Sequence, residues 1–174
     1  MRSDLSLSGF IESSASQFRA YKKLADGALE QIDDASLFEK FSPESNSITV
    51  LIQHVSGNLR FRWADFLTAD GEKEWRDRAG EFEEKHVSRE ELLAAWESGW
   101  DILFKSLGAL LPAHLKRMVT IRVEKLSVIQ AIQRSLTHTA YHVGQIVYLC
   151  KAMADSEWRS LSIPRSSRFS TSSS

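Results

Sequence analysis

His138 and His142 are spaced four residues apart, which is the spacing of a metal-ligand pair carried by one helix. They lie in a long stretch of periodic apolar residues that predicts a helix over about 126–153. At ~3.6 residues per turn, a gap of four places both side chains on one helix face, one turn apart. Two imidazoles so placed can share one divalent metal ion, provided that another element supplies a third ligand.

His54 is the best candidate for the third ligand. At ~100° per residue it falls at the edge of the apolar face of a second predicted helix, which Asn46 or Ser47 can cap and which runs to about residue 67. The sequence therefore predicts a three-histidine metal site inside a helix bundle. Thr139 follows His138, so the segment is not the His-Glu-x-x-His signature of metalloproteases, which carries its own general base.

Two amides accompany the histidines. Asn58 lies one turn from His54, and Gln145 lies one turn from His142. We interpret Asn58 and Gln145 as cofactor-binding residues that support the ligands or face a substrate. The alternative, which spacing leaves open, is an ordinary capped or solvated amide. Of the other histidines, His86 and His114 are expected at the surface.

Four amphipathic helices must position these residues. We expect helices over about 8–32, 47–67, 89–107 and 126–153, the third opened by a Ser88–Glu91 capping box. Residues 68–87 are charged and contain two glycines, so we expect a long exposed loop. The fold class predicted is all-α, an antiparallel four-helix bundle with one short extended segment at about 117–123. The bundle domain spans 1–158, and 159–174 form a Ser-rich C-terminal tail, within the same domain or loose.

Composition narrows the classes of function. With 174 residues, the chain is long enough to bury a core as one domain, and its net charge of −1 offers no basic field for nucleic acid. The longest charge-free run, 135–150, is shorter than the ~20 residues of a membrane span. The only cysteine, Cys150, excludes an intrachain disulfide and is expected to be buried. We expect a soluble, cytoplasmic protein with no nucleic-acid or membrane partner.

The segments 47–54 (SITVLIQH) and 138–146 (HTAYHVGQI) resemble the DinB/YfiT-like superfamily of metal-dependent four-helix-bundle proteins, and more narrowly a bacterial branch of it. The resemblance extends from the first helix to about Trp158. It implies an antiparallel bundle whose ligands are His54, His138 and His142, a zinc or nickel ion with solvent completing its shell, and frequently a homodimer. Characterised relatives include thiol-cofactor-dependent S-transferases and a maleylpyruvate isomerase that uses a low-molecular-weight thiol.

Three functions remain open on the sequence. The first is a metal-dependent enzyme acting on a small molecule, either a thiol-dependent S-transferase or a hydrolase, with zinc as the first expected metal, nickel as the second, and a low-molecular-weight thiol as a further cofactor. The second is a non-catalytic metal-binding or stress-response bundle whose metal is structural. The third is a plain helical interaction protein with packed histidines. A homodimer is expected as the assembly.

Overall fold

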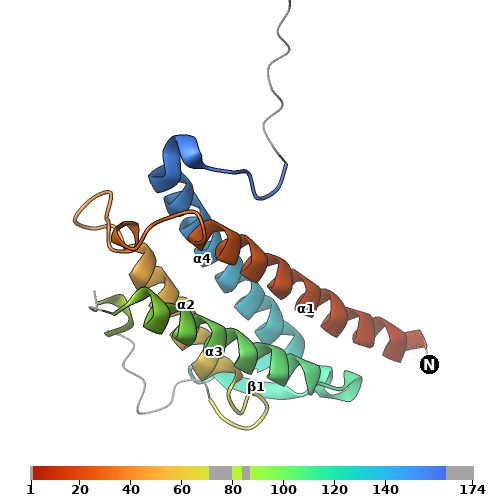
Figure 1. Cartoon of the computed structure of the whole chain (residues 1–174). Coiled ribbons are helices and arrows are strands. Elements are labelled where there is room, and N and C mark those ends of the chain that lie inside the picture. The colour runs from red at the N-terminus through yellow and green to blue at the C-terminus, as the bar shows by residue number, and fades with distance from the viewer. Residues whose placement is uncertain (1, 71–79, 84–86, 164–174) are drawn as a thin grey trace, which may run out of the picture.

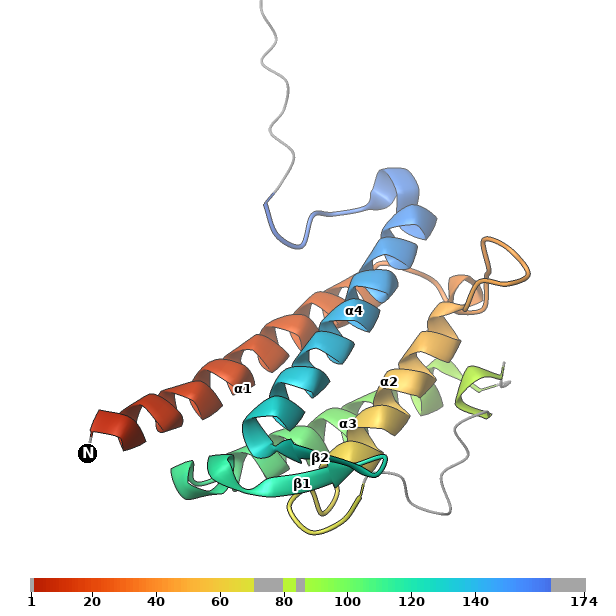
Figure 2. The same ribbon diagram turned by 180° about the vertical axis from the view of Figure 1, so that it is seen from behind.

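Four helices carry the fold of this computed structural model, which describes residues 2–70, 80–83 and 87–163. They are α1 (Arg2–Leu29), α2 (Ile48–Trp63), α3 (Arg89–Gly108) and α4 (Val128–Ala154) (Figure 1). The pair α1 and α4 runs antiparallel to the pair α2 and α3 (Figure 2). The predicted antiparallel four-helix bundle is therefore confirmed.

The bundle core contains a cluster of buried aromatic side chains. Phe18 of α1, Trp63 of α2 and Trp100 of α3 are all fully buried. The Phe18 ring meets those of Trp63 and Trp100 edge-on, with centroids 6.0 Å and 6.3 Å apart, a geometry that aromatic rings prefer. Trp96 is also buried, and its indole N–H donates to Asp26 at 2.8 Å, which joins α3 to α1. These large side chains pack α1, α2 and α3 against one another.

Serine caps begin the last three helices. The Ser47 hydroxyl accepts from the N–H of Val50, and Ser88 forms the predicted capping box with Glu91. Ser127 forms a second capping box with Gln130 at the start of α4, two residues after the predicted start. Each cap satisfies N–H groups that the first helical turn leaves without a backbone partner. α2 ends at Trp63, earlier than predicted.

A long connection, residues 64–88, joins α2 to α3. Both helices point the same way (Figure 2). The prediction of an exposed loop is wrong for part of this connection. A short 3₁₀ turn, Gly80–Phe82, packs against α2, and its Gly80 and Glu81 are buried.

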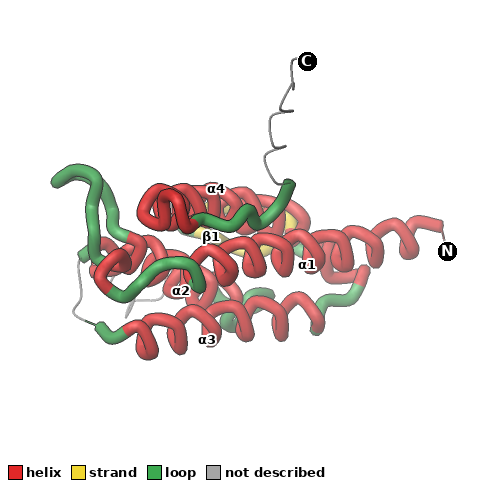
Figure 3. The backbone as a smooth tube through the Cα atoms, turned by 45° about the horizontal axis from the view of Figure 1, so that its top comes forward, coloured by secondary structure: helices red, strands yellow, loops and turns green. Residues whose placement is uncertain are grey.

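A two-stranded hairpin precedes α4 and covers one end of the bundle (Figure 2). Strand β1 (Met118–Ile121) pairs antiparallel with β2 (Glu124–Ser127), with Ile121 opposite Glu124. The prediction had one extended segment; the second strand was missed because its sequence lacks an apolar alternation. Figure 3 shows this hairpin as the strand structure among the helices.

The described start of the C-terminal segment lies against the end of α1, where Leu161 contacts Gly27, and against the turn that follows α1. The backbone of Arg159 exchanges hydrogen bonds with the side chain of Gln31, at 2.7 Å and 3.2 Å. Residues 164–174 of the predicted tail lie outside the described part of the chain. Among the described residues, no helix combines the length and apolar character that a membrane crossing requires.

Candidate metal centre

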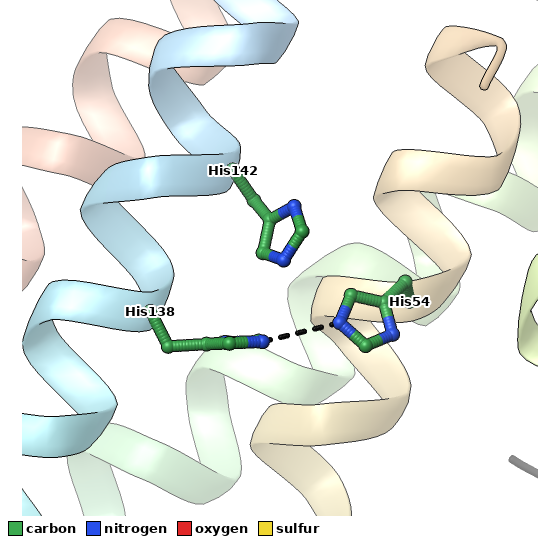
Figure 4. A group of neighbouring side chains, drawn as sticks. All are labelled: His54, His138 and His142. Carbon is green, nitrogen blue, oxygen red and sulfur yellow. Dashed lines mark hydrogen bonds between the residues drawn. The ribbon is translucent and has the colours of Figure 1, made fainter. Parts of the chain in front are cut away.

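His54 of α2 and the pair His138 and His142 of α4 meet where the two helices face each other (Figure 4). Each offers a ring nitrogen, and these nitrogens all lie within 4.8 Å of one another. A hydrogen bond from the Trp63 indole N–H to the Ser135 hydroxyl, 3.0 Å long, joins α2 to α4 beside the histidines. The helix packing thus places residues that are 84 positions apart in the sequence at one point.

The spacing of the three rings suits a metal ion. Nε2 of His54 lies 3.1 Å from Nε2 of His138, and the ring centroids of the three pairs are 4.6–5.1 Å apart. Two nitrogens bound tetrahedrally to one zinc at ~2.0–2.1 Å lie about 3.3–3.4 Å apart. A displacement of a few tenths of an ångström brings His54 and His138 to that separation, so the cluster could hold a metal ion.

Two hydrogen bonds orient two of the rings. Oε2 of Glu81 lies 3.1 Å from Nδ1 of His54, and Oε1 of Gln145 lies 2.9 Å from Nδ1 of His142. Carboxylate and amide oxygens accept, so the Nδ1 N–H of each ring donates, and a neutral ring in this tautomer presents the lone pair of its Nε2. Histidines that bind metals commonly have their second nitrogen held in this way.

Gly57 makes room for the Glu81 carboxylate. Gly57 lies on α2, three residues after His54, and a Cβ atom there would come within 2.9 Å of Oε1 of Glu81. Such a contact is too close to be tolerated without displacement of the carboxylate. The absence of a side chain at position 57 therefore lets the long connection approach α2 closely enough to reach His54.

Burial keeps the later histidine pair neutral. It lowers the pKa of His138 to about 3, and positive charge on His142, His54, Arg62 and Arg122 acts in the same direction. Burial, with His54, also lowers the pKa of His142, against the opposing effect of its bond to Gln145. Neutral imidazoles bind a metal without first losing a proton.

A cavity of about 280 Å³ opens beside the cluster, and all three histidines line it. Its walls come from α2, α4, the hairpin and the 3₁₀ turn. Phe82 of that turn packs on the His54 ring with centroids 4.5 Å apart. The other lining residues are Asn58, Arg62, Trp63, Phe66, Ile121, Arg122, Ala131, Arg134 and Ser135. A small molecule could reach a metal held by the histidines through this space.

The other predicted site residues have separate positions. Asn58 is buried and lines the cavity, whereas Gln145 lies outside the lining and contacts His142. His114 is partly buried and accepts from the N–H of Leu111, away from the cluster. His86 lies outside the described residues. Cys150 is fully buried, as predicted.

Sequence reasoning missed Glu81, Phe82 and the arginines of the cavity. Glu81 stands in a run of charged residues, where a solvated carboxylate is the ordinary expectation. The available signal was Gly57, because a glycine inside a helix often marks a close approach of another segment. That signal does not say which segment approaches.

The comparison with known proteins identifies one family whose model matches this chain. A family model described as "Protein of unknown function (DUF1572)" matches residues 6–167. No curated protein and no solved structure matches the chain.

Proposed function

The chain belongs to the DUF1572 family, whose function is unknown, and we propose that it is a metal-dependent enzyme acting on a small molecule. In this proposal, Nε2 atoms of His54, His138 and His142 hold a divalent ion, zinc in the first place and nickel in the second. The observation that carries the proposal is the convergence of three histidine nitrogens beside a cavity.

The donor set supports zinc or nickel. Imidazole nitrogen suits zinc, copper, iron and nickel, whereas magnesium and calcium prefer oxygen ligands. All three members of the described cluster are histidines. The resemblance of the two histidine segments to the DinB/YfiT-like superfamily supports the same choice of metals.

The cavity favours a catalytic metal over a structural one. Structural zinc sites are usually closed by four protein ligands, whereas catalytic sites keep three and leave a position open. Here the described cluster has three members, and the cavity adjoins them. The bound ion would act as a Lewis acid that lowers the pKa of a water or thiol.

The surrounding residues have definite tasks in this proposal. Glu81 and Gln145 hold His54 and His142 with Nε2 directed to the ion. The rings of Trp63 and Phe66, stacked with centroids 4.6 Å apart, form an apolar wall that excludes bulk water from part of the cavity. Asn58 offers an amide to a bound substrate.

In this proposal the protein's own thiol, that of Cys150, is not the nucleophile. Cys150 is buried, and burial raises the pKa of its thiol to about 12, so it stays protonated. We therefore propose either a low-molecular-weight thiol, as in an S-transferase, or water, as in a hydrolase. The resemblance to thiol-dependent relatives supports the thiol.

Metal analysis of purified, reconstituted protein tests the proposal. We expect close to one equivalent of zinc in the wild type and His114→Ala, and severe loss in both His54→Ala and His138→Ala. Full occupancy in His54→Ala, or less than about 0.2 equivalents in the wild type, would contradict the site, because built sites bind tightly.

Activity is tested on protein that metal analysis shows to be loaded. A panel of thiols and electrophiles, followed by thiol consumption, is expected to give turnover that chelation abolishes. A structural metal would instead give two results together. The metal-loaded protein would turn over neither thiols nor hydrolysable esters, and chelation would sharply lower its melting temperature.

A further inference from the structure

We propose that the cavity beside the histidines selects a substrate carrying a carboxylate or phosphate group, which Arg62, Arg122 and Arg134 bind. This inference rests on the proposed function, since it names the class of molecule that the metal centre acts on. Three arginines line the cavity, and its described lining contains no aspartate or glutamate.

The arginines come from three different elements. Arg62 lies on α2, two turns after His54; Arg134 lies on α4, one turn before His138; and Arg122 lies at the tip of the hairpin. The cavity thus has imidazoles in one part of its wall and guanidinium groups in another. A guanidinium binds carboxylate or phosphate oxygens through two parallel hydrogen bonds, which fixes the orientation of the bound group.

Two of the three arginines lie near carboxylates that are not part of the described cavity lining. Arg62 lies 3.8 Å from Asp70, and Arg134 lies 2.7 Å from Glu124. Neither acid belongs to the described cavity lining. The described lining carries three guanidinium groups and no carboxylate, and a divalent ion on neutral histidines would add positive charge. Such a field attracts anions and disfavours cations.

The hairpin turn that carries Arg122 is a second, independent observation. Arg122 and Val123 have φ angles of 51° and 62°, in the left-handed region where such residues are disfavoured. A two-residue turn of this form is normally Asn-Gly. Backbone strain of this kind persists where the residue serves another purpose, and the charge of Arg122 in the cavity supplies one.

Asp70 holds the strained turn in place. Its two carboxylate oxygens accept from the backbone N–H groups of Arg122 and Val123, at 3.2 Å and 3.4 Å. The same carboxylate lies beside Arg62. One acidic residue therefore positions two of the three arginines that line the cavity.

The test compares two thiols of equal length, 3-mercaptopropionate and 3-mercaptopropan-1-ol, binding to zinc-loaded protein by calorimetry. Both offer a thiol, so the ratio of their dissociation constants isolates the carboxylate. In the wild type we expect the carboxylate to bind about tenfold more tightly or better. Arg122→Asn and Arg134→Gln are expected to reduce that ratio several-fold while the zinc content stays unchanged.

Val123→Gly is the matched control for Arg122→Asn. Both changes suit the left-handed turn, but only Arg122→Asn removes a charge, so Val123→Gly is expected to keep the wild-type ratio. Arg117→Gln, at an exposed position outside the lining, is a second control. Competition by inorganic phosphate at constant ionic strength shows whether phosphate is accepted as well as carboxylate.

A ratio near one in loaded wild-type protein, or an unchanged ratio in both arginine variants, would overturn the anion site and leave the metal site standing. Failure to retain zinc would overturn the proposed function itself, and the substrate assignment with it. Zinc content is measured on each calorimetry sample, so the two failures are distinguished.

Discussion

Oε2 of Glu81 lies 3.1 Å from Nδ1 of His54, although the two residues belong to different elements. Glu81 comes from the long connection between α2 and α3, and both side chains are buried. The contact fixes the His54 ring with Nε2 directed towards the later pair (Figure 4). A short described segment of the connection between α2 and α3 thus contributes to the candidate metal centre.

Removal of this carboxylate is expected to weaken metal binding. Glu81→Ala should lower zinc affinity by about 10–100-fold and Glu81→Gln by less, since an amide oxygen still accepts from Nδ1. Competition with a chromophoric chelator measures the change. Glu83→Gln, two residues along at an exposed position, is the control and should match the wild type.

Gly57→Ala is expected to act through the same carboxylate. Its Cβ would meet Oε1 of Glu81 at 2.9 Å, so zinc affinity should fall as in Glu81→Ala. In the double variant the two losses should not add, because the carboxylate is already absent. If the two losses of zinc affinity were additive, Gly57 would act through the packing of α2 and not through the Glu81 carboxylate.

The difference between predicted and observed site has a physical origin. His138 and His142 were recognised from a spacing within one helix, and the Ser88–Glu91 box from a spacing within one turn. Such local patterns are visible in the sequence. Glu81 is buried because a distant segment packs at Gly57, and no local pattern records which segment packs where.

Only the first strand of the hairpin was predicted from the sequence, for a related reason. Val119 and Ile121 alternate with polar residues and are buried, but β2 is stabilised by its pairing with β1 and by its connection to α4. Its turn, Arg122-Val123, lacks the Asn-Gly signal that marks such turns. Of the two residues that depart from the turn rule, Arg122 borders the cavity.

In metal-free protein, the free energy of unfolding is expected to fall as the pH is lowered from 6.5 towards 3. The pKa of His138 is lowered to about 3 in the folded protein, from an ordinary 6.5. The unfolded chain therefore binds a proton in this window that the folded chain does not, and stability rises with pH. Urea unfolding over this pH range measures the slope.

His138→Gln is the reference for that slope. The carboxylates of the chain contribute equally to both proteins, so the difference between the two slopes reports His138. We expect a shallower pH dependence in His138→Gln. Superimposable slopes would mean that His138 is not kept neutral by burial.

Cys150 is expected to resist alkylation in the folded protein. Burial raises the pKa of its thiol to about 12 and blocks access. Iodoacetamide at mildly alkaline pH should modify less than about a tenth of the thiol in native protein, and all of it in denaturant. Mass spectrometry counts the adducts. Complete modification of native protein would make Cys150 a candidate nucleophile.

Relief of the strained turn is expected to preserve or increase stability. Left-handed conformations cost non-glycine residues on the order of 1–3 kcal/mol, against ~0.5–1 kcal/mol for the greater freedom of glycine. Val123→Gly should therefore be neutral or stabilised by about 1–2 kcal/mol in urea unfolding. In Val119→Gly, a change at a buried strand position, the free energy of unfolding should fall by ~2 kcal/mol or more. A comparable loss of unfolding free energy in Val123→Gly would show that the turn is not strained.

Anomalous scattering at the zinc absorption edge, from crystals of zinc-reconstituted protein grown without chelator, tests the central claim most directly. The account predicts one strong peak, ~2.0–2.1 Å from Nε2 of each of His54, His138 and His142. A peak that leaves out His54, or zinc bound only elsewhere on the protein, would contradict it.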